Sequence, residues 1–259
     1  MAWVLLIIAV TVLWVASLCK VFHVYYSPSK AIYFGNGEIL QKKNVLLVIA
    51  HPDDECMFFT PTINYLTSRG HNLHIFCMST GNADGMGDSR KYELHNACAV
   101  LKVPLQQVKI LDHPDLQDGF GKVWNHTLLA KITEEEITSC GIDLVITFDS
   151  YGVSGHCNHR DVHFGIRKLL LDFRQREIEA WELVTTNILR KYSGPIDIWL
   201  SMLLAILHQS EEVHCLLNEH PFKSFRSMAQ HSSQWVWFRK LFVSFSSYTY
   251  VNTLRKIKA

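Results

Sequence analysis

The chain lacks CxxC motifs, internal repeats and low-complexity segments. Its cysteines are scattered and odd in number, at positions 19, 56, 77, 98, 140, 157 and 215. This pattern argues against a disulfide framework and favours reduced thiols in a cytosolic protein. The composition, 48% hydrophobic and 19% charged, is that of a globular protein, and 259 residues suffice for one large domain or two small ones.

The N-terminal segment lacks charge. Residues 2–19 contain no charged side chain, and apolar residues continue to Tyr26 with Lys20 and His23 among them. Eighteen apolar residues are about enough to cross a bilayer. No Lys or Arg precedes this core, which favours a retained anchor over a cleaved signal peptide. We therefore predict a transmembrane anchor over residues 2–26, and the lysines that follow it favour a cytosolic body.

The C-terminal segment lacks acidic residues. Residues 220–259 contain seven Lys or Arg and no Asp or Glu, which leaves residues 1–219 at a net charge of about −6. A basic tail on a mildly acidic body favours an anionic surface as partner. We predict a helical extension over residues 191–259. Its aromatic and basic stretch, residues 234–258, either lies on a membrane surface or packs in the core.

Between these segments, strand-like and helix-like patterns alternate. After a polar linker predicted over residues 27–43, strand-like apolar runs occur at 44–50, 73–79, 108–112, 143–149 and 180–189. Helix-like segments separate them at 56–70, 89–103, 125–141 and 159–173. This alternation predicts a Rossmann-like α/β domain over residues 44–190, with a mostly parallel sheet covered by helices on both faces.

Polar segments follow the predicted strands directly. They read AHPDDE, STGNADGMGD, DHPDLQDGFG and DSYGVSGHCNH. Ligands of open α/β sheets bind at the carboxyl ends of the strands, so these segments should meet at one end of the sheet.

Two of these segments carry an unusual density of metal-binding side chains. A helix N-terminus explains each acid of His51-Pro52-Asp53-Asp54-Glu55 singly, and two surface histidines would explain GHCNH. Together they predict a catalytic metal site, which needs three protein ligands and an open position for water. One of Asp53 and Asp54 can ligate while the other faces the water. One of His156 and His159 can ligate while the other faces the substrate.

AHPDDE followed by GHxxH on this α/β pattern resembles the LmbE-like or PIG-L family of zinc-dependent de-N-acetylases, over about residues 44–190. The resemblance implies that His51, Asp54 and His159 bind Zn²⁺ or another divalent metal. It implies Asp53 as general base and His156 as the residue that stabilises the oxyanion. Arg90 and Glu93 match an R..E pattern of the family. Arg90 would then either contact the sugar of the substrate or lie solvated on the helix surface.

The motifs contain two further polar residues, Glu55 and Asn158, whose roles can also be predicted. Glu55 is expected to cap or orient rather than react. Asn158 stands where many bacterial members carry Asp, so their pH behaviour should not be transferred to this chain.

The motif segments and the anchor are most similar to eukaryotic members of the family. That resemblance implies hydrolysis of the N-acetyl group of GlcNAc-phosphatidylinositol, giving GlcN-phosphatidylinositol and acetate in GPI-anchor biosynthesis. The implied location is the endoplasmic reticulum membrane, single-pass, with the catalytic domain cytosolic. No nucleic-acid partner is expected, and protein partners stay open.

Three alternatives remain. The chain could deacetylate another amino-sugar, or be a non-catalytic membrane-tethered scaffold with a relic metal site. Two histidines and a carboxylate also make the facial triad of a non-haem iron oxygenase. The α/β alternation argues against that chemistry, which is usually found in a β-barrel.

Overall fold

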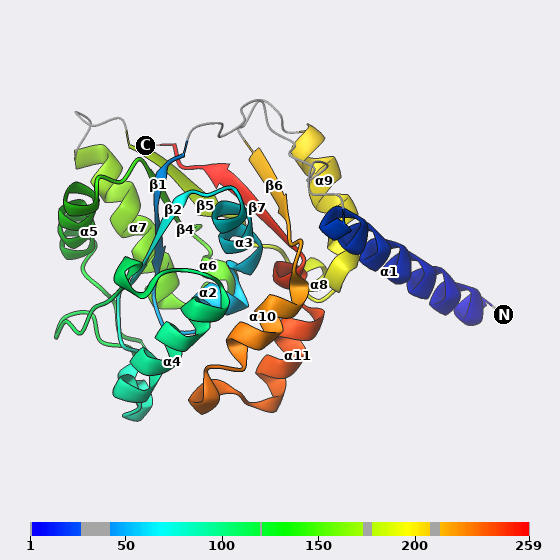
Figure 1. The fold of residues 1–259 in the computed structure, drawn as a ribbon, viewed down its shortest axis with the longest axis horizontal. Helices are drawn as coiled ribbons and strands as arrows, with labels where there is room; N and C mark the ends of the chain where they lie inside the picture. Colours follow the sequence, from blue (N-terminus) through cyan, green and yellow to red (C-terminus); the bar gives the residue numbers. More distant parts are fainter. Residues whose placement is uncertain (1, 27–41, 120, 173–177, 208–212, 259) are drawn as a thin grey trace.

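The computed structural model describes residues 2–26, 42–119, 121–172, 178–207 and 213–258 (Figure 1). The predicted linker lies almost wholly outside these residues. A seven-stranded sheet of order β3-β2-β1-β4-β5-β7-β6 forms the centre. Its strands are β1 Asn44–Ile49, β2 Asn72–Cys77, β3 Val108–Ile110, β4 Leu144–Phe148, β5 Glu179–Leu183, β6 Val213–Leu217 and β7 Val251–Lys256.

The first five strands are parallel, as the alternation predicts. Val45 of β1 pairs with Leu73 of β2 on one side and with Leu144 of β4 on the other. Apart from the partly exposed Asn44, β1 and β4 are fully buried, which explains their continuous apolar sequences. The strand order reverses between β1 and β4, and such a switch point is where α/β sheets bind ligands.

Helices cover both faces of the sheet. Because βαβ crossovers are right-handed, α3 (Thr60–Ser68) and α4 (Gly87–Val100) lie on one face and α5 (His126–Cys140) and α7 (Cys157–Asp172) on the other. Figure 1 shows α5 and α7 side by side at the left of the sheet. Gly165 permits this approach, since a Cβ there would lie 2.6 Å from Leu129 Cβ. The fold class predicted from the sequence, a mixed α/β sheet with flanking helices, is confirmed.

The C-terminal segment is not only helical, and in this respect the prediction was wrong. It contains α9 (Asp197–Leu207), α10 (Pro221–Met228) and α11 (Trp237–Phe245), but also β6 and β7. Strand β7 pairs antiparallel with β5, with Leu254 opposite Leu183, and β6 pairs with β7. These two strands protect the backbone groups of β5, which would otherwise form a sheet edge. Residues 191–259 therefore complete the sheet.

The N-terminal helix α1 (Ala2–Tyr26) projects from the body (Figure 1). Residues Trp3–Val21 are long and apolar enough to cross a membrane, although a signal sequence passes the same test. Side chains from Trp3 to Leu13 are exposed, whereas Ser17 and Val21 are fully buried against the body. The helix is thus attached to the domain only through its C-terminal half.

Candidate active site

The turn after β1 directs two predicted ligands toward the sheet end. Asp54 begins the short helix α2 (Asp54–Met57). Its Oδ2 accepts hydrogen bonds from the backbone N–H groups of His51 (2.8 Å) and Ala50 (3.0 Å). The carboxylate is therefore folded back onto the strand end, and its Oδ1 is left facing the histidines.

The loop after β4 is organised by Asp149. Its carboxylate accepts hydrogen bonds from the N–H groups of Tyr151, Gly152 and Thr185 and from the Thr185 hydroxyl. Gly152 has φ +58°, and a Cβ there would lie 2.8 Å from His159 Cβ. Glycine at this position lets the loop pass close to His159 at the start of α7.

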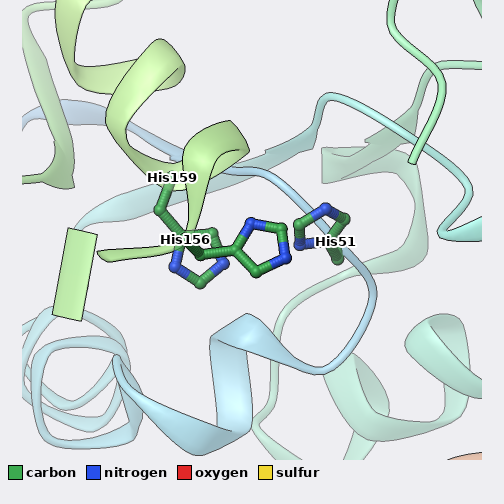
Figure 2. Close-up of side chains that lie close together, drawn as sticks. All are labelled: His51, His156 and His159. Carbon is green, nitrogen blue, oxygen red and sulfur yellow. The ribbon is translucent and has the colours of Figure 1, made fainter. Parts of the chain in front are cut away.

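Three imidazoles meet at the switch point (Figure 2). The ring centroids of His51 and His159 each lie 4.8 Å from that of His156. One nitrogen from each ring lies within 4.8 Å of the others. His51 and His159 are buried, whereas His156 is exposed. The structure thus brings together all the predicted ligands, with Asp54 Oδ1 3.1 Å from His159 Nε2.

Neighbouring groups orient the rings of His159 and His51. His159 stacks on Phe148 with its ring centroid 4.1 Å away, and its Nδ1 lies 3.0 Å from the Gly152 carbonyl oxygen. His51 Nε2 lies 3.2 Å from both Asn158 Oδ1 and Asp118 Oδ1. Asn158 therefore contacts a predicted ligand directly, through an amide rather than a carboxylate.

Asp53 sits in a strained conformation between two arginines. Its φ of +116° is rare for a residue with a side chain, and such strain costs about 1–3 kcal/mol. The Glu55 carboxylate helps to hold it by accepting the Asp53 N–H at 3.0 Å. Asp53 Oδ2 lies 3.1 Å from Arg239 Nη2 and 3.5 Å from Arg90 Nη2. The predicted base is thus fixed in place by its neighbours.

Arg90 is buried, so the alternative that it is solvated was wrong. Its guanidinium donates to the carbonyl oxygens of Gly81 (2.8 Å) and Pro52 (2.7 Å), which joins two of the strand-end loops. Its Nε has no hydrogen-bond partner among the described residues. Glu93 of the same helix accepts from the N–H and hydroxyl of Ser233.

Burial and the charges of the site together shift its pKa values in opposite directions. Burial raises the pKa of Asp53, although Arg239 and Arg90 oppose the shift. Burial would also raise the pKa of Asp54, but the charges and hydrogen bonds of His159 and His51 outweigh it and lower that pKa. Burial, with the charges of His159 and His51, lowers the pKa of His156 to about 4. Asp54 is therefore held ionised, while Asp53 more readily accepts a proton.

Sequence reasoning missed three residues of the site. They are Asp118 beside His51, Arg239 beside Asp53, and His231, whose Nε2 lies 2.7 Å from Glu55 Oε1. Asp118 lies in DHPDLQDGFG, which was recognised as a strand-end segment. Arg239 lies in the aromatic and basic stretch 234–258, for which the sequence predicts a membrane surface or core packing rather than this site, and no local pattern marks His231.

The chain matches the PIG-L family, described as GlcNAc-PI de-N-acetylase, over residues 46–170. It is 37% identical over 249 residues to a probable N-acetylglucosaminyl-phosphatidylinositol de-N-acetylase of Dictyostelium discoideum, covering 86% of this chain and 96% of that protein. The chain belongs to the PIG-L family. A second PIG-L relative, the N-acetylglucosaminyl-phosphatidylinositol de-N-acetylase of Bos taurus, is 38% identical, covering 88% of this chain and 87% of that one.

Solved structures share the PIG-L fold at low sequence identity. The N,N'-diacetylchitobiose deacetylase of Pyrococcus horikoshii superposes with a TM-score of 0.59 at 14% identity, covering 83% of this chain and 84% of that one. The A40926 pseudoaglycone deacetylase Dbv21 superposes with a TM-score of 0.58 at 13% identity, covering 83% and 97%. The predicted family is confirmed by the sequence matches, and these structures agree on the fold.

Proposed function

We propose that this chain hydrolyses the N-acetyl group of GlcNAc-phosphatidylinositol, giving GlcN-phosphatidylinositol and acetate for GPI-anchor biosynthesis. The observation that carries the proposal is the site at the β1–β4 switch point, in a chain that matches relatives of that name over most of its length. The buried Asp53 and Asp54, side by side with different partners, provide separate groups for metal binding and proton transfer.

We propose His51, Asp54 and His159 as the protein ligands of a divalent metal. We propose Zn²⁺ as that metal, because two imidazoles and a carboxylate are typical ligands of a catalytic zinc ion. The contacts of His159 support this. Without a metal, His159 Nε2 and Asp54 Oδ1 lie 3.1 Å apart as a hydrogen-bonded pair. When His159 is neutral and its one N–H is on Nδ1, where the Gly152 carbonyl is placed to accept it, Nε2 offers a lone pair beside the carboxylate. Two electron-pair donors so placed fit a cation that both can bind.

The residues of the chain can then carry out amide hydrolysis. A bound zinc ion lowers the pKa of water to about 7 and polarises a carbonyl group. Asp53 accepts the proton of the attacking water and returns it to the leaving amine. The neighbouring Arg239 and Arg90 fix its carboxylate. His156, which is neutral at its lowered pKa, donates an N–H to the developing oxyanion.

Arg90 is proposed to contact the sugar through its Nε. That group has no partner among the described residues, and the other guanidinium nitrogens bind the loops that carry Asp53 and Gly81. The same side chain would then hold the substrate and position the base.

We further propose that α1 is a single membrane anchor and that the domain lies on the cytosolic side of the endoplasmic reticulum membrane. The lysines after the span and the free cysteines support this orientation. A lipid substrate is consistent with such tethering.

A direct assay tests the proposal. Purified full-length protein is incubated with GlcNAc-phosphatidylinositol in mixed micelles and with free GlcNAc, and released acetate is measured. We expect acetate from the lipid, loss of activity after chelation, and recovery when Zn²⁺ is restored. Acetate from free GlcNAc at an equal rate would favour another amino-sugar substrate. A metal-loaded protein that is inactive on both would favour a non-catalytic scaffold.

A further inference from the structure

An apolar groove separates α1 from the C-terminal helices. It has a volume of about 380 Å³ and is lined by Trp14 and Leu18 of α1, Phe222 and Phe225 of α10, and Ser244 and Tyr250. The hydroxyl groups of Ser244 and Tyr250 in its lining are hydrogen-bonded within the protein. The Ser244 hydroxyl donates to the Lys240 carbonyl oxygen (2.7 Å), and the Tyr250 hydroxyl donates to the Ser244 carbonyl oxygen (2.8 Å). The groove therefore presents an apolar surface.

The groove lies where α1 leaves the domain. Side chains from Trp3 to Leu13 are exposed and, apart from Thr11, apolar, whereas Ser17 and Val21 are buried. If α1 crosses the membrane, the exposed part is the part in lipid, and the groove opens at the level where the helix enters the bilayer. Figure 1 shows α1 projecting from the body beside α9, on the side of the molecule that also carries α10 and α11.

The surface around the groove suits a lipid–water interface. Phe222 and Trp237 are each 72% exposed, and Arg226 and Lys240 are exposed near them on the same two helices. Residues 220–259 contain no acidic side chain that would repel a phosphate. Aromatic and basic side chains together are typical of protein surfaces that contact phospholipid.

One helix connects the groove with the active site. Ser244 in the last turn of α11 lines the groove, and Arg239 in its first turn contacts Asp53. Between them, Val243 packs in a buried cluster with Cys56, which belongs to the helix that starts at Asp54. A lipid bound along α11 would thus have its apolar part at one end of the helix and its head group near the other.

We propose that this groove binds an acyl chain of the lipid substrate while the sugar occupies the site beside Asp53. The inference rests on the proposed function and adds a binding site for the apolar part of the substrate. Burial of the chain would lower KM, and more strongly for longer acyl chains, because each enclosed methylene group is removed from water.

The test compares two substrates in the full-length protein: dipalmitoyl GlcNAc-phosphatidylinositol and the chain-free GlcNAc-inositol phosphate. Ser244→Trp fills the groove. Ser68→Trp is the control, because Ser68 is exposed in α3 and its hydroxyl likewise donates to a carbonyl of its own helix. We expect Ser244→Trp to lower kcat/KM for the dipalmitoyl substrate about tenfold, with chain-free turnover unchanged, and Ser68→Trp to lower neither.

Several outcomes would overturn the proposal. Equal loss on both substrates would show that Ser244→Trp acts independently of the acyl chain, and no loss on either would show that the chain binds elsewhere. A diazirine at the end of the substrate chain should label α10 or α11. Equal labelling by phosphatidylcholine with the same chain would assign the groove to ordinary bilayer lipid. If the unmodified protein hydrolyses neither substrate, the proposed function fails rather than the groove alone.

Discussion

The guanidinium of Arg239 lies 3.1 Å from the carboxylate of Asp53, although the two residues come from opposite ends of the domain sequence. Asp53 follows the first strand of the sheet, and Arg239 lies on α11 in the C-terminal segment. The positive charge opposes the effect of burial, which raises the pKa of Asp53. The C-terminal segment is therefore part of the candidate active site as well as part of the sheet.

Replacing Arg239 should slow catalysis. Hydrogen bonds to charged groups contribute about 1.5–3 kcal/mol, so Arg239→Ala is expected to lower kcat about 10- to 100-fold. Arg239→Lys keeps the charge without the planar fork and should recover part of the loss. Steady-state kinetics on the lipid substrate provide the measurement, and Lys131→Ala, exposed in α5 on the opposite face of the sheet, is the control. A wild-type kcat for Arg239→Ala would show that the contact has no role in positioning Asp53.

The two adjacent acids should have separable roles. Asp53→Ala is expected to abolish turnover and leave metal binding largely intact, because Asp53 contacts arginines rather than the histidines. Asp54→Ala should lose the metal, because its Oδ1 faces His159. Metal content of the purified variants, measured together with single-turnover rates, separates these effects. Equal loss of metal in both variants would mean that the roles are misassigned.

The three histidines should also divide into two groups. His51→Ala and His159→Ala are expected to lose metal, whereas His156→Ala should keep it and lose about 10²- to 10³-fold in kcat as an oxyanion donor. The structure makes this a demanding test, since nitrogens of all three rings lie within 4.8 Å of one another. Loss of metal in His156→Ala would identify that residue as a ligand, and an unchanged kcat would exclude the oxyanion role.

The sequence predicted the strands and helices that show a local hydrophobic pattern, but not the contacts between distant segments. The apolar runs that form β1 to β5 alternate with helices. His51 comes just after β1, and His159 lies at the start of the helix that follows β4, so the sequence could predict that the two histidines meet. The position of strand β7 could not be predicted in this way, because β7 lies beside β5 only through pairing between segments that are distant in the sequence. The same applies to the contact of His231 with Glu55. A pairing between distant residues leaves no periodic signal in either segment.

Helix packing gives a prediction about stability. A Cβ at Gly165 would lie 2.6 Å from Leu129 Cβ, where α7 crosses α5. Ala has the higher helix propensity, by about 1 kcal/mol, but forcing the helices apart costs about 1–3 kcal/mol. Gly165→Ala should therefore lower the free energy of unfolding or leave it unimproved. Denaturant unfolding measures this, with the half-exposed Lys168→Ala of the same helix expected within about 0.5 kcal/mol of wild type. A clear gain in stability would contradict the tight crossing.

The glycosylation sequon Asn125-His126-Thr127 tests the orientation in the membrane. Asn125 is exposed, so access would not protect it from modification. Its side chain caps α5 by accepting the N–H groups of Thr127 (2.8 Å) and Leu128 (3.2 Å). If the domain is cytosolic, the glycosylation machinery cannot reach this residue. We therefore expect Asn125 to be unmodified in cells and the domain to be accessible to protease in intact microsomes.

Two substitutions make this result specific. Asn125→Gln removes both the sequon and the short capping side chain, and loss of an N-cap costs about 1 kcal/mol. Asn125→Asp removes the sequon but keeps an oxygen that can cap the helix. A cytosolic domain predicts one electrophoretic mobility for wild type and both variants, unchanged by endoglycosidase. An endoglycosidase-sensitive mass shift in wild type that disappears in both variants would place the domain in the lumen. The substrate would then be drawn from the opposite leaflet, and the proposed orientation of α1 would be reversed.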